Sequence, residues 1–108
     1  MPTAYKVLGQ VAPLAITETV LYTVPSATST VASTLSVCNR GVSTTFRVYI
    51  RPNNETLADK HYIVYDNYVN AGDSVFLTLG ITMDAADVVY VYATLATLSF
   101  SLFGSEIT

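Results

Sequence analysis

The sequence predicts one all-β domain: an antiparallel two-sheet β-sandwich of about eight strands, for which a jelly roll is one topology. Val, Ile and Thr supply 34 of the 108 residues, and these side chains fit a pleated, half-buried surface better than a helix. Short apolar runs separated by turn residues recur along the chain, at the spacing expected of a sandwich or barrel. No run has the apolar periodicity of a long helix.

Eight runs have the composition of strands. Each is rich in β-branched or aromatic residues and is bounded by Pro, Gly, Asn, Asp or Ser, which interrupt sheets. We expect strands at Tyr5–Leu8, Val20–Val24, Thr30–Cys38, Thr45–Arg51, His61–Tyr65, Val75–Leu79, Val88–Ala93 and Thr97–Phe103.

The residues between these runs favour turns. Asn39–Gly41 predicts a hairpin-like turn, because Asn and Gly tolerate a positive φ. Pro52 should stop the fourth strand, since proline has no N–H to donate to a β-ladder. Asn70–Asp73 and Met83–Asp87 separate the later strands, and residues 84–87 could hold a single helical turn.

Alternation of apolar and polar residues predicts which face of each strand is buried. Phe46, Val48 and Ile50 share one face of the fourth run. The other expected inward residues are Val31, Leu35, Val37, Val75, Leu77, Leu79, Leu98, Phe100 and Leu102. The run Val88–Ala93 is apolar on both faces, as in a strand covered on both sides. Its second face needs a cover, which another subunit could provide.

Length and composition exclude several classes of protein. A chain of 108 residues makes one domain, residues 1–108, and its single cysteine, Cys38, cannot form an intramolecular disulfide. The net charge of −3, with five Lys and Arg, argues against binding to nucleic acid or an anionic membrane. The charge-free stretches Thr19–Asn39 and Val88–Ser105 contain too many Ser and Thr for a membrane helix, and the N-terminus lacks the features of a signal peptide.

The low charge of the chain points to an assembly. Charged residues make up 12% of the sequence, about half the usual share. Ser and Thr, 24 residues together, and eight tyrosines carry the polarity instead. A surface with so few charges is poorly protected against association, so we expect the chain to pack against neighbours.

The sequence contains no motif for catalysis or for nucleotide or metal binding. His61 is the single histidine, and no serine occupies the strained turn of a hydrolase, so we expect His61 at a strand end on a partly solvated face. Asp73 and Asp87 should accept backbone N–H groups at turns before strands. We therefore expect no enzyme activity, no cofactor and no metal.

The candidate partner site is a stripe of arginines and tyrosines. Arg47, Tyr49 and Arg51 share one face of the fourth run, and Tyr90 and Tyr92 belong to the run that needs a cover. Arg and Tyr are enriched at protein interfaces, because Arg pairs with carboxylates and Tyr buries a large area at low entropic cost. We predict a protein interface at these five residues, with an ordinary solvated sheet face as the simpler interpretation.

Three further tyrosines raise the question of carbohydrate stacking. They are Tyr62, Tyr65 and Tyr68, on and after the fifth run. In a regular strand, Tyr62 points away from Tyr65, so these rings would not form one platform.

Eight segments of the chain carry a family resemblance. They are KVLGQ from Lys6, LYTVP from Leu21, STLSVCNRG from Ser33, FRVYIRP from Phe46, KHYIVYD from Lys60, LTLGITM from Leu77, DVVYVYA from Asp87 and LSFSLFGSEIT from Leu98. They cover most of the chain, and CNRG, KHYIVYD and the FGSEIT ending are the most specific. Together they resemble small β-rich virion structural proteins of tailed bacteriophages, cyanophage-like and of the capsid cement or decoration type.

The resemblance implies a structural component of the virus particle and supplies no catalytic residue. The first expectation is a cement protein that binds the outer shell and stabilises the head by symmetric subunit contacts. The alternative is a neck, tail or tail-fibre accessory protein with receptor or glycan binding. We expect as partners further copies of the chain, a trimer before a dimer, and the major capsid protein or other virion proteins, with no nucleic acid and no membrane. The location would be the virion, assembled in the bacterial host cytoplasm, with Met1–Val11 and Glu106–Thr108 reaching towards neighbours.

Overall fold

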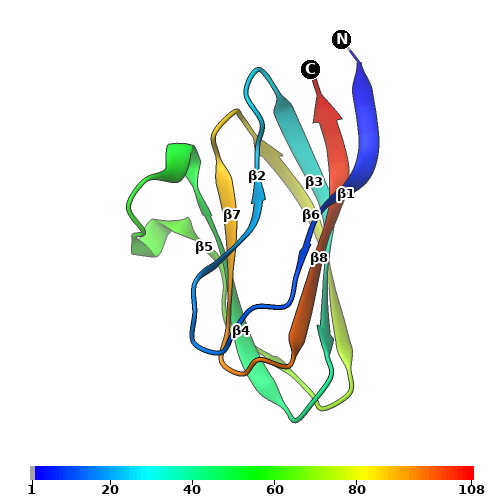
Figure 1. Ribbon diagram of the computed structural model, residues 1–108, viewed down its shortest axis with the longest axis vertical. Helices are drawn as coiled ribbons and strands as arrows, with labels where there is room; N and C mark the ends of the chain where they lie inside the picture. The colour runs from blue at the N-terminus through cyan, green and yellow to red at the C-terminus, as the bar shows by residue number, and fades with distance from the viewer. Residues whose placement is uncertain (1) are drawn as a thin grey trace.

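A computed structural model describes residues 2–108, apart from the side chain of Leu79. The chain forms two four-stranded antiparallel sheets that face each other as a sandwich (Figure 1). Sheet A contains, in spatial order, β1 (Thr3–Val11), β8 (Leu98–Ile107), β3 (Ser29–Asn39) and β6 (Ser74–Met83). Sheet B contains β2 (Thr19–Thr23), β7 (Val88–Ala93), β4 (Thr44–Arg51) and β5 (Tyr62–Val69). Two short 3-10 turns, η1 (Pro52–Asn54) and η2 (Asp59–His61), lie between β4 and β5.

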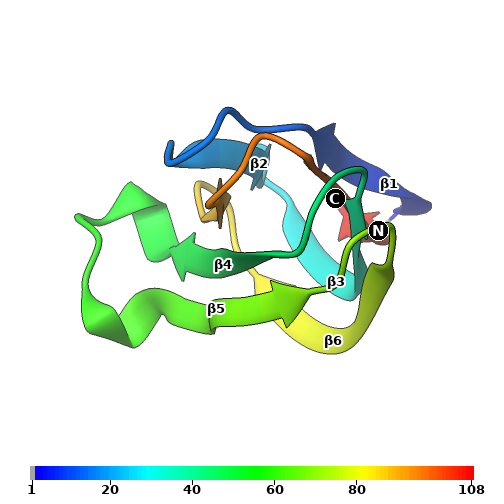
Figure 2. The same cartoon turned by 90° about the horizontal axis from the view of Figure 1, so that it is seen from below.

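The strands follow the order of a jelly roll. The first strand pairs with the last, β2 with β7, β3 with β6, and β4 with β5, so the chain behaves as one long hairpin that has been rolled up. The pairs β3–β8 and β4–β7 join the turns of this roll into two sheets. Figure 2 shows β4 and β5 running side by side into the loop that holds η1 and η2. The predicted sandwich is confirmed, and its topology is the jelly roll.

The core lies between the two sheets. Phe46 of sheet B meets Phe100 of sheet A edge to face, with ring centroids 5.8 Å apart. The inward positions predicted for β4 and β8 are confirmed, since Val48, Leu98 and Leu102 are buried in the same cluster. Burial of each such side chain contributes about 1.5–3 kcal/mol, so this cluster holds the two sheets together. The expected inward residue Leu79 falls outside the described side chains.

All eight expected strands are present, and Val88–Ala93 has the predicted bounds. Most of the others extend beyond their apolar runs, because a ladder continues wherever a partner strand supplies hydrogen bonds. Turn positions follow the sequence in the same way: β4 ends at Arg51, immediately before the proline.

The segment 84–87 is a β-turn and not the single helical turn that its sequence also allowed. Ala86 takes a left-handed φ of 72°, and the N–H of Asp87 donates to the carbonyl of Asp84 at 3.1 Å. The carboxylate of Asp87 accepts the N–H of Asp84 at 2.9 Å, and that of Asp73 accepts the N–H of Ser74 at 2.8 Å. The predicted turn-capping roles of these two aspartates are therefore confirmed.

Two irregular strands contradict the faces predicted from simple alternation. In β3 the register shifts just after Ala32, which is buried, while Val31 lines a hollow on the outer surface. In β5 the register shifts twice and Asp66 takes a φ of 51°. Tyr62 and Tyr65 therefore pack edge to face with centroids 4.9 Å apart, and the expectation that they point in opposite directions is wrong.

The predicted hairpin after β3 is instead a corner between the sheets, because β4 belongs to sheet B. The buried side chain of Asn39, 2% exposed, holds this corner. Its Nδ2 donates to the carbonyls of Val42 at 2.7 Å and of Val69 and Asn70 at 3.2 Å, and its Oδ1 accepts from the Gly41 N–H and the Thr97 hydroxyl at 3.0 Å. One amide thus ties together three connections between strands.

A second polar network joins the sheets near the chain termini. Tyr22 of β2 donates to Glu106 of β8 at 2.5 Å and shares a hydrogen bond of 2.8 Å with Thr30 of β3. The Nζ of Lys6 lies 2.8 Å from the other Glu106 oxygen. Hydrogen bonds from Lys6 first and then Tyr22 lower the pKa of Glu106, while burial and the bond to Glu106 raise the pKa of Tyr22 to about 12.

The terminal segments expected to reach neighbours are built into sheet A instead. Thr3–Val7 pairs in continuous register with Phe103–Ile107, and the N–H of Thr108 donates to the carbonyl of Pro2 at 3.0 Å. Backbone pairing holds these residues in place, so they are not free arms. Met1 lies outside the described residues.

Replacing Asn39 by Ala should lower the free energy of unfolding by about 3 kcal/mol, because several buried backbone groups lose their partners at once. Denaturant titration followed by tyrosine fluorescence measures the loss. Asn67→Ala is the control, since Asn67 is exposed and accepts the N–H of the adjacent Tyr68, and it should cost less than about 0.5 kcal/mol. Equal losses would contradict the role given to Asn39.

The network at Glu106 should make stability depend on pH. Its pKa in the folded chain lies below the ordinary value of 4.5, so its stabilising effect is present above about pH 4.5 and is lost as the pH falls through the folded pKa. Glu106→Gln should therefore be less stable than the wild type at neutral pH by about 1 kcal/mol. Urea unfolding at several pH values should show this difference shrinking as the solution becomes more acidic; a constant difference would refute the explanation.

Candidate functional site

The five residues predicted to form an interface come together on the outer face of sheet B. Across the β4–β7 pair, Arg47 lies opposite Tyr92 and Tyr49 lies opposite Tyr90, with Arg51 at the end of the same strand. These side chains point away from the core, as the alternation of β4 predicted.

Aromatic rings form the centre of this cluster. The ring of Tyr49 stacks on that of Tyr90, with centroids 5.4 Å apart and planes 9° from parallel. Tyr62 meets Tyr49 edge to face at 5.2 Å, and Tyr65 in turn meets Tyr62. Such contacts add about 0.5–1.5 kcal/mol per pair beyond the buried area, so the rings form a small second core.

Both arginines of the stripe, Arg47 and Arg51, pack on these rings, and each pairs with a carboxylate of the same chain. The Arg47 guanidinium lies 4.3 Å from the ring centre of Tyr65 and 4.9 Å from that of Tyr92, and it donates to both carboxylate oxygens of Asp66 at 2.7 and 3.2 Å. The hydrogen bond from Arg47 lowers the pKa of Asp66. Arg51 lies 4.6 Å from the ring centre of Tyr90.

Glu18 joins the cluster from the connection between β1 and β2. Its carboxylate accepts a hydrogen bond from the hydroxyl of Tyr49 and lies 3.0 Å from Nη1 of Arg51. The neighbouring Ile16 anchors this connection, because its N–H donates to the carbonyl of Ala93 at 2.8 Å. Burial, followed by the hydrogen bond to Glu18, raises the pKa of Tyr49 well above its usual range, so Tyr49 stays protonated and donates this bond.

The chain itself covers much of this face of β7, so the cover that the sequence predicted does not depend on another subunit. Leu57, between η1 and η2, packs against the tyrosines, and the hydroxyl of Tyr90 donates to Asn54 at 2.6 Å. Tyr49 and Tyr90 are consequently only 2% and 8% exposed. The protein interface at all five residues stays a prediction. In the single chain Arg47, Arg51 and Tyr92 are half-buried, so they are the members of the stripe that a partner could reach.

His61 closes the same loop and is buried rather than partly solvated as predicted. Its Nδ1 accepts the N–H of Ala58 at 3.0 Å, and its Nε2 lies 3.3 Å from the carboxylate of Glu55. Within residues 2–108, no group of three or more His, Cys, Asp and Glu side chains gathers as metal ligands would. None of the helical segments there has the length and apolarity to cross a membrane.

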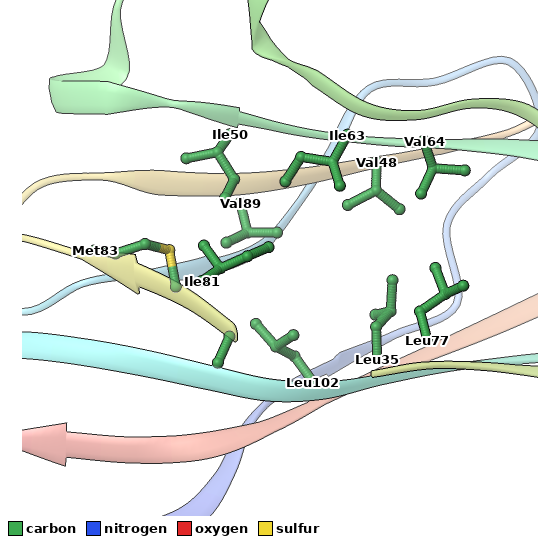
Figure 3. A pocket seen from close by; sticks show the side chains of 11 residues that line it. Leu35, Val48, Ile50, Ile63, Val64, Leu77, Ile81, Met83, Val89 and Leu102 are labelled. Atoms are coloured by element: carbon green, nitrogen blue, oxygen red, sulfur yellow. The ribbon is translucent and has the colours of Figure 1, made fainter. Parts of the chain in front are cut away.

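The interior of the sandwich offers little room for a ligand. A cavity of about 10 Å³ lies between the sheets, where Val48, Ile50 and Val89 face Leu35 and Leu102 (Figure 3). Its lining is entirely apolar. Sites for small organic ligands are typically about 300–1,000 Å³ with a few polar groups, so this space is a packing gap in the core.

The outer face of sheet A is a second candidate surface, and we call it the neutral face. The four strands of this sheet contain two charged residues, Lys6 and Glu106, which form an ion pair, and Glu106 also accepts the hydroxyl of Tyr22. Arg40, just after β3, lies at one end of this face, where its Nε donates to the hydroxyl of Ser99 at 3.0 Å. Its outward side chains include Tyr5, Val7, Gln10, Val31, Thr34, Ser36, Cys38, Ser74, Phe76, Thr78, Ser99, Ser101, Phe103 and Ser105. Tyr5 and Phe76 are 85% and 65% exposed.

Sequence reasoning found parts of these two surfaces and missed others. It identified the Arg–Tyr stripe, but not Glu18 or Asp66, because their contacts join residues 31 and 19 positions apart. The charge-free stretches Thr19–Asn39 and Val88–Ser105 were the available signal for the neutral face. Their strands had first to be assigned to one sheet before that signal described a surface.

The link between Glu18 and Tyr49 should be energetically coupled. Glu18→Ala leaves a buried hydroxyl without its acceptor and should cost about 1–3 kcal/mol in unfolding free energy. A double-mutant cycle with Tyr49→Phe should give a coupling of about 1 kcal/mol or more. The exposed pair Lys60–Glu55, at 3.8 Å, serves as the control with a coupling below about 0.5 kcal/mol; equal couplings would show that Glu18 holds nothing in place.

Comparisons with known proteins give a similar fold and no family. No protein-family model matches the chain, and no curated protein matches its sequence. A chain from the structure of infectious bursal disease virus Gx strain aligns with 97% of this chain and 32% of its own length, with a TM-score of 0.60 and 11% identity. A pentameric capsid protein isolated from metagenomic phage sequences aligns over 95% of this chain and 63% of its own, with a TM-score of 0.38 and 16% identity. The chain thus spans less than two thirds of either protein, and the first alignment shows a shared fold.

Proposed function

We propose that the chain is a virion structural protein that binds the outer shell of a bacteriophage head as a cement or decoration protein. The observation that carries this proposal is the neutral face. Interface cores are depleted in charge and enriched in aromatic residues, and a broad uncharged face with exposed Tyr5 and Phe76 has this composition. Exposed patches of this kind mark sites of interaction.

The two faces of the sandwich differ in a way that supports this orientation. The outer face of sheet B is covered by the chain's own loop and carries paired charges. On the neutral face, charge among the described residues is confined to the Lys6–Glu106 ion pair and to Arg40 just after β3, whose Nε donates to the hydroxyl of Ser99 at 3.0 Å. In a decoration protein, the neutral face would lie on the shell and sheet B would face the solvent. The major capsid protein, or another virion protein, is the partner we propose.

The fold and the sequence resemblance add independent support. The jelly roll occurs in viral capsid and lectin domains alike, so it permits the role without assigning it. The fold is shared with a chain from a virus structure, and the sequence segments resemble virion proteins of tailed phages. Assembly would take place in the host cytoplasm, with the virion as the final location.

Weak contacts suffice for such a protein because the shell repeats them. Each copy sees the same arrangement of capsid subunits, and copies that also touch one another gain by avidity. We propose self-association on the shell, with a trimer as the first expectation and a dimer as the second. Area buried across boundaries between capsid subunits would then oppose the outward pressure of the packaged DNA.

A role as a neck, tail or tail-fibre accessory protein is the second candidate, and one surface feature favours it. Asp59, Tyr62 and Tyr65 line a hollow on sheet B, where a carboxylate stands beside two rings in contact. Aromatic faces with a nearby hydrogen-bonding group suit a sugar ring. Labelled chain confined to the tail, together with glycan binding that Tyr65→Ala abolishes, would favour this candidate over the head protein.

A charge placed on the neutral face should weaken attachment to the head. Phe76→Lys should bind at least about tenfold more weakly to particles that lack the protein, because it buries an unpaired charge. Tyr68→Lys is the matched control on β5, since Tyr68 is 58% exposed, and it should bind like the wild type. Co-sedimentation with particles measures binding.

The exposed Cys38 of the neutral face provides a direct second readout. Its reaction with a thiol reagent should be fast in the free protein and slow on the particle. Particles that lack the protein should also lose DNA at lower temperature or milder osmotic shock. Equal binding of the two lysine variants together with unprotected Cys38 would overturn the proposal that this face meets the shell.

A further inference from the structure

The N-terminal half of β1 is a regular, uncovered sheet edge. Thr3–Val7 pairs with β8 in unbroken register on one side, and all five residues are exposed. Figure 1 shows this half of β1 as the outermost strand beside the chain ends. The edge closes at Gly9, where a Cβ would lie 2.1 Å from the carbonyl oxygen of Leu21, because β2 approaches there.

The other three sheet edges are less regular or less exposed than this half of β1. β2 has five residues and a register shift after Val20. β6 keeps an unbroken register with β3 over Ser74–Thr78, but Val75 and Leu77 of that run are partly buried against the core, whereas Thr3–Val7 is exposed throughout. β5 has two register shifts and the left-handed residue Asp66. Short, bulged or bent edges resist the addition of a strand, whereas a straight edge with unpaired N–H and C=O groups invites it.

The hydrogen bonds at the chain ends show which backbone groups of β1 are free. The N–H of Thr108 donates to the carbonyl of Pro2, so Pro2 faces β8. In an antiparallel strand the N–H and C=O of one residue point to the same side, and the side alternates along the strand. Ala4 and Lys6 therefore also face β8, while Thr3, Tyr5 and Val7 direct their N–H and C=O groups outward.

For the chain in solution we propose the dimer rather than the trimer: two copies associate by antiparallel pairing of their β1 edges about a two-fold axis at Tyr5. In this register Tyr5 pairs with Tyr5 of the second copy and Thr3 pairs with Val7, and each such pair exchanges two hydrogen bonds. Registers with the two-fold axis at Ala4 or Lys6 instead would pair fewer of the outward N–H and C=O groups of Thr3, Tyr5 and Val7. The result is one continuous sheet across both molecules.

Charge favours this register over its neighbour. With Tyr5 on the axis, Lys6 lies opposite Ala4 of the second copy and keeps its ion pair with Glu106, whose carboxylate is 2.8 Å away. An axis at Lys6 would instead place two lysines directly opposite each other, which is destabilising. The Tyr5 rings meet on the outer side, so pairing also joins the two neutral faces into one surface.

A single strand edge buries little area, so the contact is weak in solution, and the test must detect weak association. Tyr5→Pro removes the outward N–H but leaves the ladder to β8 intact, since proline is tolerated where the N–H faces solvent. Compared with Tyr5→Ala, which loses the same ring but keeps the N–H, Tyr5→Pro should raise the dimer dissociation constant about 10- to 100-fold. Sedimentation equilibrium at up to about 1 mM protein measures both, with circular dichroism to confirm the fold.

Cysteine cross-linking tests the register itself. In a Cys38→Ser background, Tyr5→Cys should form a disulfide-linked dimer, because paired Cα atoms about 5.5 Å apart suit a disulfide. Val7→Cys should not, since the two copies of residue 7 would lie about 13 Å apart along the strands. Equal cross-linking of the two variants, or equal dissociation constants for Tyr5→Pro and Tyr5→Ala, would overturn the inference. Attachment to phage heads is measured separately, so either proposal can fail while the other stands.

Discussion

A two-sheet sandwich buries the inner face of each sheet and leaves two outer faces. In this structure the chain covers the outer face of sheet B with its own loop and leaves that of sheet A open, and the other features follow from this difference. The inner faces meet around Phe46 and Phe100, and that apolar contact sets the spacing of the layers. On the outside, sheet B has a strand that is apolar on both sides, and exposure of its outward Val88 and Tyr90 to water would be costly. The ten residues between β4 and β5 fold back over it. Within residues 2–108, no comparable loop covers the outer face of sheet A.

The irregular register of β5 allows its tyrosines to contribute to this cover. The two register shifts in β5 turn Tyr62 towards Tyr49 and Tyr65 towards Arg47, where a regular strand would have sent one of these rings to the other face. The stacked rings exclude water, and the arginines lie on them with carboxylates from Glu18 and Asp66 as counter-charges. Guanidinium groups can be held in this way because their planar faces pack on aromatic rings while their edges donate hydrogen bonds. On this side of the molecule, both arginines are therefore paired with carboxylates of the same chain.

The sequence predicted the strands well because each had both an apolar run and a breaker at its ends. Val88–Ala93 was placed with its final bounds, and Phe46, Val48 and Ile50 on their correct face. Errors arose where one extra residue in a ladder reversed the alternation, as at Val31 and Tyr65. No single strand carries a signal for such a shift, since it depends on which partner the strand meets. The role of Asn39 could not be predicted either, because its partners lie in segments far away in the sequence. A residue typical of turns is buried and forms hydrogen bonds to three connections between strands.

The rolled-up hairpin also explains why the first strand is the exposed one. Rolling a hairpin pairs the chain ends with each other, so β1 and β8 form the outermost turn of the roll, and only β8 gains a second neighbour in β3. Farther along β1, the close approach of Gly9 to Leu21 seals the join between the sheets, but the strand continues beyond that join on its N-terminal side. Its first residues thus extend the neutral face past the body of the sandwich with backbone groups pointing outward. The chain combines an uncharged surface and an open edge in one sheet, and a neighbour that pairs with the edge is placed to extend that same surface.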